Sequence, residues 1–125
     1  MRRLLSLVIV AIAAAFLVAP SASADAGNSA QGERAFKKCA ICHAKDKTNG
    51  IGPGMSGIIG RHAGSVPGFR YSEVMKNSNI VWDEKSLDAF IMSPQKVLPG
   101  NLMPFPGIPS QEERSNLIAY LETLR

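Results

Sequence analysis

Residues 39–43 have the sequence CAICH, in which two residues separate Cys39 from Cys42 and His43 follows directly. Two thiols at this spacing on a helical turn lie on one side of the chain, where both can bond to one planar group. The next residue then places an imidazole beneath the centre of that group. C-x-x-C-H is the signature of covalent c-type haem attachment. The motif therefore predicts one haem c, attached through Cys39 and Cys42, with His43 as an iron ligand.

Three other uses of the cysteine pair fit the sequence less well. A thioredoxin-like redox motif is expected in a βαβ setting, and no strand–helix–strand pattern precedes Cys39. A zinc site needs four ligands, and outside the motif only His62 is left as a good soft donor. A simple disulfide suits an oxidising compartment, but it gives no reason for the presence of His43.

The iron of a haem that only transfers electrons usually has a second axial ligand on its opposite side. Met103 lies in a segment rich in proline and glycine (residues 98–107), where proline stiffens the chain and glycine permits close approach to a ring. Its thioether is a soft ligand, so Met103 is the preferred candidate. Position alone leaves four others open, which we expect to be solvated or to fill space: His62, Met55, Met75 and Met92.

The N-terminal residues 2–24 have the pattern of a secretory signal peptide. Arg2 and Arg3 precede an uncharged apolar run (residues 4–19), and Ala22-Ser23-Ala24 is a small-x-small cleavage site. The apolar run is shorter than the roughly 20 residues of a membrane-spanning helix. We therefore expect cleavage after Ala24 and export of residues 25–125 to the periplasm. An uncleaved membrane anchor at residues 4–19 is the alternative.

The charge of the whole chain overstates the basicity of the exported part. The formal net charge of the 125 residues is +4, and it falls to +2 without Arg2 and Arg3. No cluster combines basic and aromatic residues, which argues against a nucleic-acid partner. Aromatic residues make up 6% of the chain, and β-branched residues do not alternate in runs, which argues against an all-β domain.

The exported part is predicted to be helical at both ends. A first helix begins at Asn28, with the side chain of Gln31 returning to the cap, and runs to about Lys38. The clearest helix is the last one, which starts at a capping box formed by Ser110 and Glu113. That helix presents an apolar face: Leu117, Ile118, Leu121 and Leu124.

Between the ends we expect further helices and long loops. A short helix follows Ser72, and a longer helix, capped by Asp83 and ended by Pro94, carries Leu87, Phe90 and Ile91 on one face. Residues 44–70 and 97–109 are rich in glycine or proline and are expected to be loops. The fold class is thus all-α, with three main helices and short ones. The predicted helices alone would leave these long loops without a core to pack on, so we expect the loops to wrap around the haem.

Residues 28–125 resemble the class I cytochromes c, close to the mitochondrial protein and its small soluble periplasmic relatives in bacteria. The resemblance implies the cytochrome c fold for residues 25–125. Besides the CAICH motif, it rests on features in chain order: Gly32-x-x-x-Phe36, Gly52-Pro53, Gly57-Ile58-Ile59-Gly60-Arg61, Pro67-Gly68-Phe69-x-Tyr71, Trp82, Pro94, Met103-x-Phe105 and Leu117-Ile118-Ala119-Tyr120-Leu121.

The resemblance also implies roles for individual residues. His43 and Met103 are the implied axial ligands, and the Pro53 carbonyl is the implied acceptor for Nδ1–H of His43, a bond that fixes the ring. Three side chains match positions around the inner haem propionate, where a buried carboxylate needs hydrogen-bond donors: Arg61, Tyr71 and Trp82. Four residues match the packing contact between the terminal helices: Gly32, Phe36, Leu117 and Tyr120.

Three positions depart from the pattern of the class I cytochromes c. Phe90 stands where a tyrosine often lies near the methionine sulfur, and Met75 stands where an asparagine is common. Asn101 stands where a threonine often supports the methionine loop. Because two of these three residues are apolar, we expect a drier methionine side with no hydroxyl bond to the sulfur from position 90.

A basic surface around the haem edge is the other implied feature, because lysines there steer acidic partners. The candidate contacts are Lys37, Lys38, Lys45, Lys47 and Lys96. Gln95 and Leu102 occupy two positions where lysine is common, so the basic face is modest. Apolar residues near the edge are expected to add to docking: Ile41, Leu102 and Phe105.

These observations indicate a monomeric, exported electron carrier rather than an enzyme. It is expected to take one electron from a quinol-oxidising cytochrome complex and to pass it to an acidic partner site on an oxidase, a peroxidase or a reaction centre. Two alternatives remain at this point. One is a dedicated redox subunit of a single dehydrogenase, and the other is a haem enzyme with a labile sixth ligand.

Overall fold

A computed structural model describes residues 26–125 of the chain. The predicted signal peptide (residues 1–24), its cleavage site after Ala24 and the alternative anchor at residues 4–19 lie outside the described residues. Among residues 26–125, no helix combines the length and the apolar character that crossing a membrane requires.

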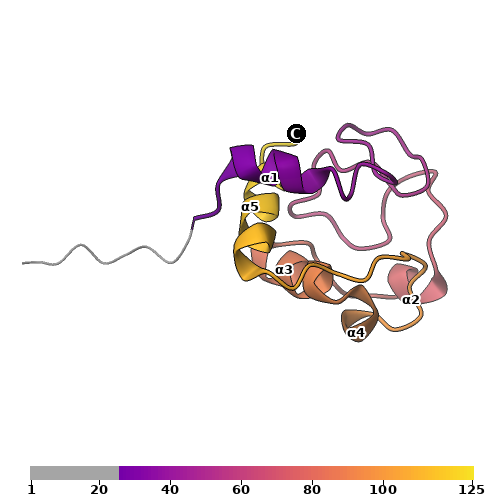
Figure 1. Cartoon of the computed structure of the whole chain (residues 1–125). Coiled ribbons are helices and arrows are strands. Elements are labelled where there is room, and N and C mark those ends of the chain that lie inside the picture. Colours follow the sequence, from indigo (N-terminus) through magenta and orange to yellow (C-terminus); the bar gives the residue numbers. More distant parts are fainter. Residues whose placement is uncertain (1–25) are drawn as a thin grey trace, which may run out of the picture.

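The described chain contains five helices joined by long loops, with the bounds α1 (Ser29–Phe36), α2 (Glu73–Lys76), α3 (Glu84–Met92), α4 (Pro94–Val97) and α5 (Gln111–Leu121). Residues 26–125 form no strand, and their one bridge of β type is an antiparallel pair between His62 and Val81. The all-α prediction is therefore confirmed. The terminal helices α1 and α5 cross at one end of the molecule, α3 lies beside α5, and the loops extend away from them (Figure 1).

The expected cap of α1 is present, but its second bond is different. Asn28 accepts a hydrogen bond from the backbone N–H of Gln31 at 2.9 Å. The Gln31 side chain does not return to the cap. Instead, the N–H of Asn28 donates to Oδ1 of Asn116 on α5 at 2.6 Å, and Asn116 Nδ2 donates to Gln31 Oε1 at 3.3 Å. A buried amide of the neighbouring helix thus completes the cap.

The prediction of a full capping box at the start of α5 is wrong in the same way. Ser110 accepts from the N–H of Glu113 at 3.3 Å, but the Glu113 carboxylate forms an ion pair with Lys38, just beyond α1. The full box occurs instead at α3, where Asp83 and Ser86 bond reciprocally at 2.7 and 2.8 Å. Tertiary contacts therefore decide which donor the side chain at the third helical position bonds to.

Two helix boundaries also differ from the expected ones. Helix α1 ends at Phe36, and the chain continues in turns through residues 37–42 rather than in helix to Lys38. Pro94 ends α3 as expected, but it also begins the short helix α4. The sequence does not predict α4, and its last residue lies in the segment expected to be loop (residues 97–109). Proline is suited to a first helical position, because the N–H that it lacks has no partner there.

The contact between α1 and α5 is very close. A Cβ atom at Gly32 would lie 1.9 Å from the Asn116 carbonyl oxygen, so only glycine lets the helices approach this far. The rings of Phe36 and Tyr120 pack next to this point with centroids 5.4 Å apart, and Leu117 is completely buried. The expected packing between the terminal helices is therefore confirmed.

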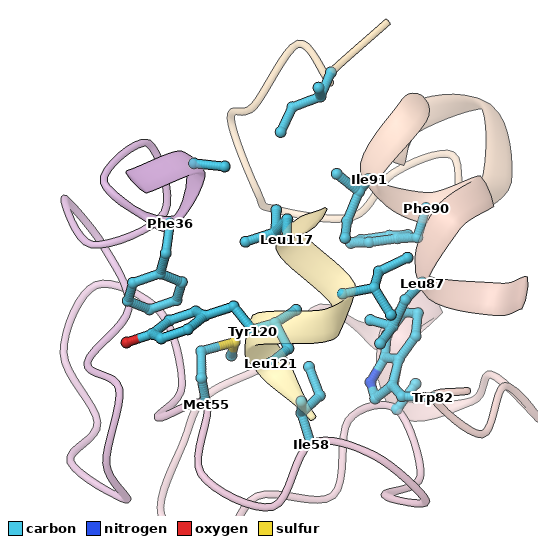
Figure 2. Packing of buried hydrophobic residues seen from close by; sticks show 14 residues of the cluster. Phe36, Met55, Ile58, Trp82, Leu87, Phe90, Ile91, Leu117, Tyr120 and Leu121 are labelled. Atoms are coloured by element: carbon cyan, nitrogen blue, oxygen red, sulfur yellow. The ribbon is translucent and has the colours of Figure 1, made fainter. Parts of the chain in front are cut away.

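The buried hydrophobic cluster extends from this contact to α3 (Figure 2). Phe36 and Tyr120 lie on one side of it, and Trp82, Leu87 and Phe90 lie on the other. The cysteine-containing turn and the methionine segment pack against the same cluster through Cys39 and Met103, which are half-buried. The core thus forms a frame that holds both segments of the predicted haem site.

Candidate haem-binding site

The CAICH motif forms a compact turn directly after α1. The N–H of Cys39 donates to Phe36 O at 2.8 Å, and the N–H of His43 donates to Cys39 O at 2.9 Å. Both cysteines are half-buried free thiols, whereas Ile41 between them points outward with 78% of its surface exposed. Burial raises the pKa of the Cys39 thiol to about 11, so the free thiol is protonated at neutral pH.

The imidazole of His43 is fixed by the loop that contains Gly52 and Pro53. Its Nδ1 lies 2.8 Å from the carbonyl oxygen of Pro53, to which it donates, and this leaves Nε2 free to bind a metal. A Cβ atom at Gly52 would lie 2.4 Å from Cε1 of His43, so the backbone of this loop lies directly against the ring. The bond to Pro53 and the contact with Gly52 together fix the ring plane.

Burial lowers the pKa of His43, and the positive charge of Arg61 adds to this, while the bond to Pro53 acts in the opposite direction. The imidazole is therefore kept neutral, which is the form that binds a metal. Two thiols and one oriented neutral imidazole are the donor set that a covalently attached haem requires. The residues present fit this group.

The segment that carries Met103 is held through backbone bonds on both sides of the methionine. Before it, the backbone N–H of Met103 donates to Oδ1 of the buried Asn101 at 2.9 Å. After it, the N–H of Ile108 donates to the carbonyl of Ile91 in α3 at 2.9 Å. At Gly107, where φ is +106°, a Cβ atom would lie 2.1 Å from the carbonyl oxygen of Met92. Only glycine can pass α3 this closely.

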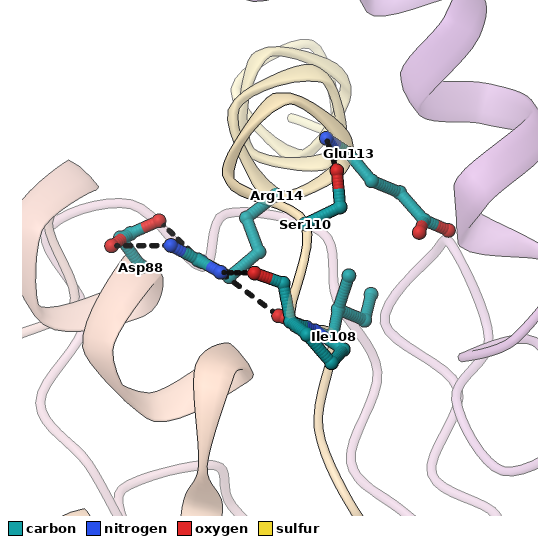
Figure 3. A network of polar contacts seen from close by, with 6 residues as sticks. Asp88, Ile108, Ser110, Glu113 and Arg114 are labelled. Carbon is teal, nitrogen blue, oxygen red and sulfur yellow. Dashed lines mark hydrogen bonds and ion pairs between the residues drawn. The ribbon is translucent and has the colours of Figure 1, made fainter.

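A buried arginine bonds to the chain that follows Met103 (Figure 3). Arg114, in the first turns of α5, is only 5% exposed, and its Nε donates to Oδ1 of Asp88 on α3 at 2.7 Å. Its Nη1 donates to the carbonyl oxygens of Ile108 and Pro109 at 2.9 and 2.8 Å. The guanidinium thus joins α3, α5 and the chain that returns from Met103.

Arg61 and Trp82 come together beside the antiparallel bridge between His62 and Val81. The N–H of Trp82 donates to Arg61 O at 2.9 Å, beside the pair formed by His62 and Val81. The Arg61 guanidinium donates to the carbonyl oxygens of Gly54 and Ser56 at 3.0 and 3.4 Å.

Tyr71 belongs to the same part of the molecule. Its Oη accepts a bond from the N–H of Val66 at 3.3 Å, and its ring packs edge-on against Phe69. Burial raises the pKa of Tyr71, with an opposing effect of the Arg61 charge. The charge of Arg61 thus acts on the pKa of both Tyr71 and His43.

The sequence of residues 29–125 matches the family model for cytochrome c. Cytochrome c2 of Rhodomicrobium vannielii is 41% identical over 116 residues, covering 91% of this chain and 93% of that protein. Cytochrome c2 of Rhodoblastus acidophilus is 42% identical over 102 residues, covering 80% of this chain and 95% of that protein. The solved structure of cytochrome cH from Methylobacterium extorquens has a TM-score of 0.75 and 40% identity, covering 78% of this chain and 99% of that one. This chain belongs to the cytochrome c family.

Membership confirms the resemblance to class I cytochromes c and the cytochrome c fold. Cytochromes c are electron-transfer proteins, so the chain is an electron carrier and not an enzyme. The family implies a covalently bound haem c, for which Cys39, Cys42 and His43 form the expected motif. Within residues 26–125, no three side chains of His, Cys, Asp or Glu gather in a way that could hold a metal ion.

The departures from the cytochrome c pattern have different surroundings. Phe90 is buried and packs on Trp82 with ring centroids 5.0 Å apart, and Met75 is half-buried against the core. Both are apolar groups in apolar surroundings. Asn101 is polar and buried, and its side chain bonds to backbone only, at Pro94 in α4 and at Leu98 and Met103 after it.

The candidate docking lysines of this cytochrome c are not equivalent. Lys38 forms the ion pair with Glu113, which neutralises much of its charge. The other four are exposed and make no ion pair with any residue of the described chain: Lys37, Lys45, Lys47 and Lys96. Leu102, which stands at a position where lysine is common, is 73% exposed.

Arg114 is a residue of this site that the motifs do not mark, although the sequence around it carries a signal. Arg114 precedes Leu117 and Ile118 by three and four positions, which places it on the apolar face of α5. A charged residue on a buried face needs a partner, and this could have marked it as part of a network. Asp88 as that partner, 26 residues away, required the structure.

Proposed function

We propose that this cytochrome c is an exported, periplasmic carrier of single electrons, which takes them from a quinol-oxidising cytochrome complex. The acceptor is an oxidase, a peroxidase or a reaction centre. The observation that carries the proposal is the orientation of His43, which follows two free thiols in the chain and whose Nδ1 is bonded to Pro53 while Nε2 remains free. The relatedness to two bacterial cytochromes c2 supports the same conclusion.

In this proposal, Cys39 and Cys42 would hold the haem through thioether bonds, and His43 and Met103 would bind its iron. The haem supplies an iron that alternates between Fe(III) and Fe(II). With both ligands supplied by the protein, the iron would have no position left for a substrate, which suits a carrier, and a histidine–methionine pair would raise the reduction potential. Pro53 keeps the imidazole in one orientation, and the anchored segment around Met103 keeps the thioether in place.

We assign Arg61, Tyr71 and Trp82 to the inner propionate. Arg61 uses two of its N–H groups for the carbonyls of Gly54 and Ser56, and a guanidinium has five. Tyr71 accepts from Val66, so its own O–H is free to donate. The indole N–H of Trp82 is the third donor. A carboxylate removed from water requires such donors, and together they would hold it ionised.

Docking is assigned to the exposed lysines Lys37, Lys45, Lys47 and Lys96, together with Ile41 and Leu102. Lysines attract an acidic partner over long range, and apolar contacts add short-range affinity. Such encounters bury little surface and dissociate quickly, as electron transfer between many partners requires.

A haem stain combined with the intact mass of the exported protein tests the proposal. The expected mass is that of residues 25–125 plus one haem, which examines attachment and the cut after Ala24 together. Oxidised protein should also show the far-red sulfur-to-iron absorption band at neutral pH. A mass without haem would overturn the whole proposal, and a missing band would remove Met103 as a ligand. Co-purification with one dehydrogenase in fixed stoichiometry would favour the dedicated subunit.

A further inference from the structure

A shallow depression of about 800 Å³ lies where the loop after the CAICH motif meets the end of α5. Backbone bonds hold the segments that form it. The N–H of Ser56 donates to Asp46 O at 3.1 Å, and the N–H of Gly57 donates to Leu124 O at 2.7 Å. The walls of the depression are therefore fixed relative to one another before any ligand binds.

Two hydroxyl groups on the lining of this depression are free to donate. Ser56 is 7% exposed and Tyr120 is 9% exposed, but the hydrogen bonds that they form within residues 26–125 use only their backbone groups. No fully buried polar side-chain atom of the described chain lacks a partner, so both hydroxyls reach the protein surface. The oxygen of Tyr120 points away from the hydrophobic cluster (Figure 2). Two buried residues thus hold O–H donors where a ligand can meet them.

The charge around the depression favours an anion. Lys45 and Lys47 are exposed, line the depression and form no ion pair with any residue of the described chain. Asp46 is the one side-chain carboxylate among the lining residues. An α-carboxylate at Arg125 would offset the guanidinium of that residue, and two lysines would still outnumber Asp46. A ligand therefore meets net positive charge together with two hydroxyl donors.

Asp46 narrows the choice of anion. Its Oδ1 accepts the N–H of Thr48 at 2.8 Å, and a carboxylate has further lone pairs with which to accept. An anion that keeps a proton can donate to this carboxylate, whereas an anion without a proton is only repelled by it. Inorganic phosphate keeps at least one proton at neutral pH, and sulfate keeps none. The lining therefore suits phosphate better than sulfate.

The depression has little to offer a membrane surface. None of the exposed large hydrophobic residues of the described chain lines it. Proteins that lie on a bilayer combine basic residues with apolar side chains that enter the headgroup region. A phosphate ion free in solution thus fits the depression better than the phosphate of a lipid headgroup.

We propose that this depression is a binding site for inorganic phosphate. In it, Lys45 and Lys47 supply the positive charge. The hydroxyls of Ser56 and Tyr120 donate to phosphate oxygens, and Asp46 accepts the proton that phosphate retains. None of the haem ligands assigned above lines the site. Because the proposed function assigns both lysines to docking, bound phosphate would also weaken the attraction of this face for an acidic partner.

An amide NMR titration of the purified protein with phosphate, at neutral pH and constant ionic strength, tests the proposal. Signals of the lining residues should shift along one saturable curve. Ser56→Ala and Tyr120→Phe should each weaken binding by about tenfold, the effect of one hydrogen bond to a charged group. Tyr120→Phe keeps the ring that packs on Phe36. Lys45→Gln combined with Lys47→Gln should weaken binding by about tenfold or more.

Two control variants remove the same kinds of group elsewhere. Lys85→Gln and Ser65→Ala change exposed residues that do not line the depression, and neither should alter the phosphate affinity. Sulfate should bind to the wild-type protein about fivefold more weakly than phosphate, because it cannot donate to Asp46. If Tyr120→Phe yields no folded protein, Ser56→Ala and the lysine pair carry the test.

Several outcomes would overturn the site. Shifts that do not saturate, or equal losses of affinity in the control variants, would show that phosphate acts only through general screening. Sulfate that binds as tightly as phosphate would remove the role of Asp46 and with it the choice of phosphate. Phosphatidylglycerol vesicles bound by a protein that ignores free phosphate, with binding lost in Ser56→Ala, would identify a lipid headgroup site instead. A purified protein without haem would overturn the proposed function and leave the phosphate titration readable.

Discussion

At the scale of single residues, Phe90 offers the most direct test of the dry methionine side. Phe90→Tyr places a hydroxyl where class I cytochromes c often have one near the methionine sulfur. An O–H donated to the sulfur draws electron density from the iron and favours the reduced state. A bond worth about 1 kcal/mol corresponds to ~40 mV for one electron, so we expect the reduction potential to rise by this order.

A redox titration of the two holoproteins measures this effect. Phe36→Tyr is the matched control, because Phe36 is also buried but lies on the opposite side of the core, against Tyr120 (Figure 2). It should leave the potential unchanged. An unchanged potential in Phe90→Tyr would argue against a dry methionine side.

The roles of single residues were predictable where they depend on local spacing. The CAICH motif could be recognised because its chemistry needs residues that are close together in sequence. Asn101 could be noted only as a departure, since its bonds depend on how the carbonyls of Pro94 and Leu98 turn in the folded chain. Arg114 was not recognised, because its partner lies on another helix.

At the scale of elements, the crossing of α1 and α5 is the contact that tolerates least change. Gly32→Ala would place a Cβ atom 1.9 Å from Asn116 O and 2.7 Å from Cβ of Tyr120, so the helices would have to separate. We expect the free energy of unfolding to fall by about 2–3 kcal/mol, as for other overpacked cores. Guanidinium denaturation of the holoprotein measures this fall.

Gly50→Ala is the control for this substitution. A Cβ atom at Gly50 meets only Cys42 O at 3.7 Å, an ordinary contact, and Gly50 does not have positive φ. The same change of residue type should therefore alter stability little. Equal losses in the two variants would show that close helix contact is not the cause.

Helix positions were predictable because caps and apolar spacing are local signals. The type and approximate place of α1, α2, α3 and α5 agree with the sequence analysis. The reciprocal cap bonds were not predictable, since Gln31 and Glu113 found partners on or beside the other terminal helix. A side chain at a helix end can bond either to the cap of its own helix or to a residue of another helix. Only the fold determines which of these two partners lies nearer.

At the scale of the whole molecule, the long loops make the fold depend on its cofactor. Cys39→Ser combined with Cys42→Ser removes both attachment points. We expect this variant to lose covalent haem and much of its helical signal, since a bound group that stabilises only the native state shifts the folding equilibrium. Haem staining and far-UV circular dichroism measure the two effects. Native helix content with a cooperative melt in the haem-free variant would contradict this expectation.

The clamp formed by Arg114 also acts on the whole molecule, because it joins α3, α5 and the chain that returns from Met103 (Figure 3). Arg114→Lys keeps the charge but cannot bond to Asp88 and to two carbonyls at once. A buried acceptor that loses its donor costs about 1–3 kcal/mol, and at least one carbonyl would lose its bond, so the free energy of unfolding should fall by about 3 kcal/mol. Asp88→Asn should cost less, since Asp88 is partly exposed and the amide oxygen of asparagine can still accept.

Denaturation followed by the far-red band and by circular dichroism compares the two variants. If the clamp holds the methionine segment to the frame, Arg114→Lys lowers both midpoints together. A loss confined to circular dichroism would show that the clamp stabilises the helices without supporting Met103.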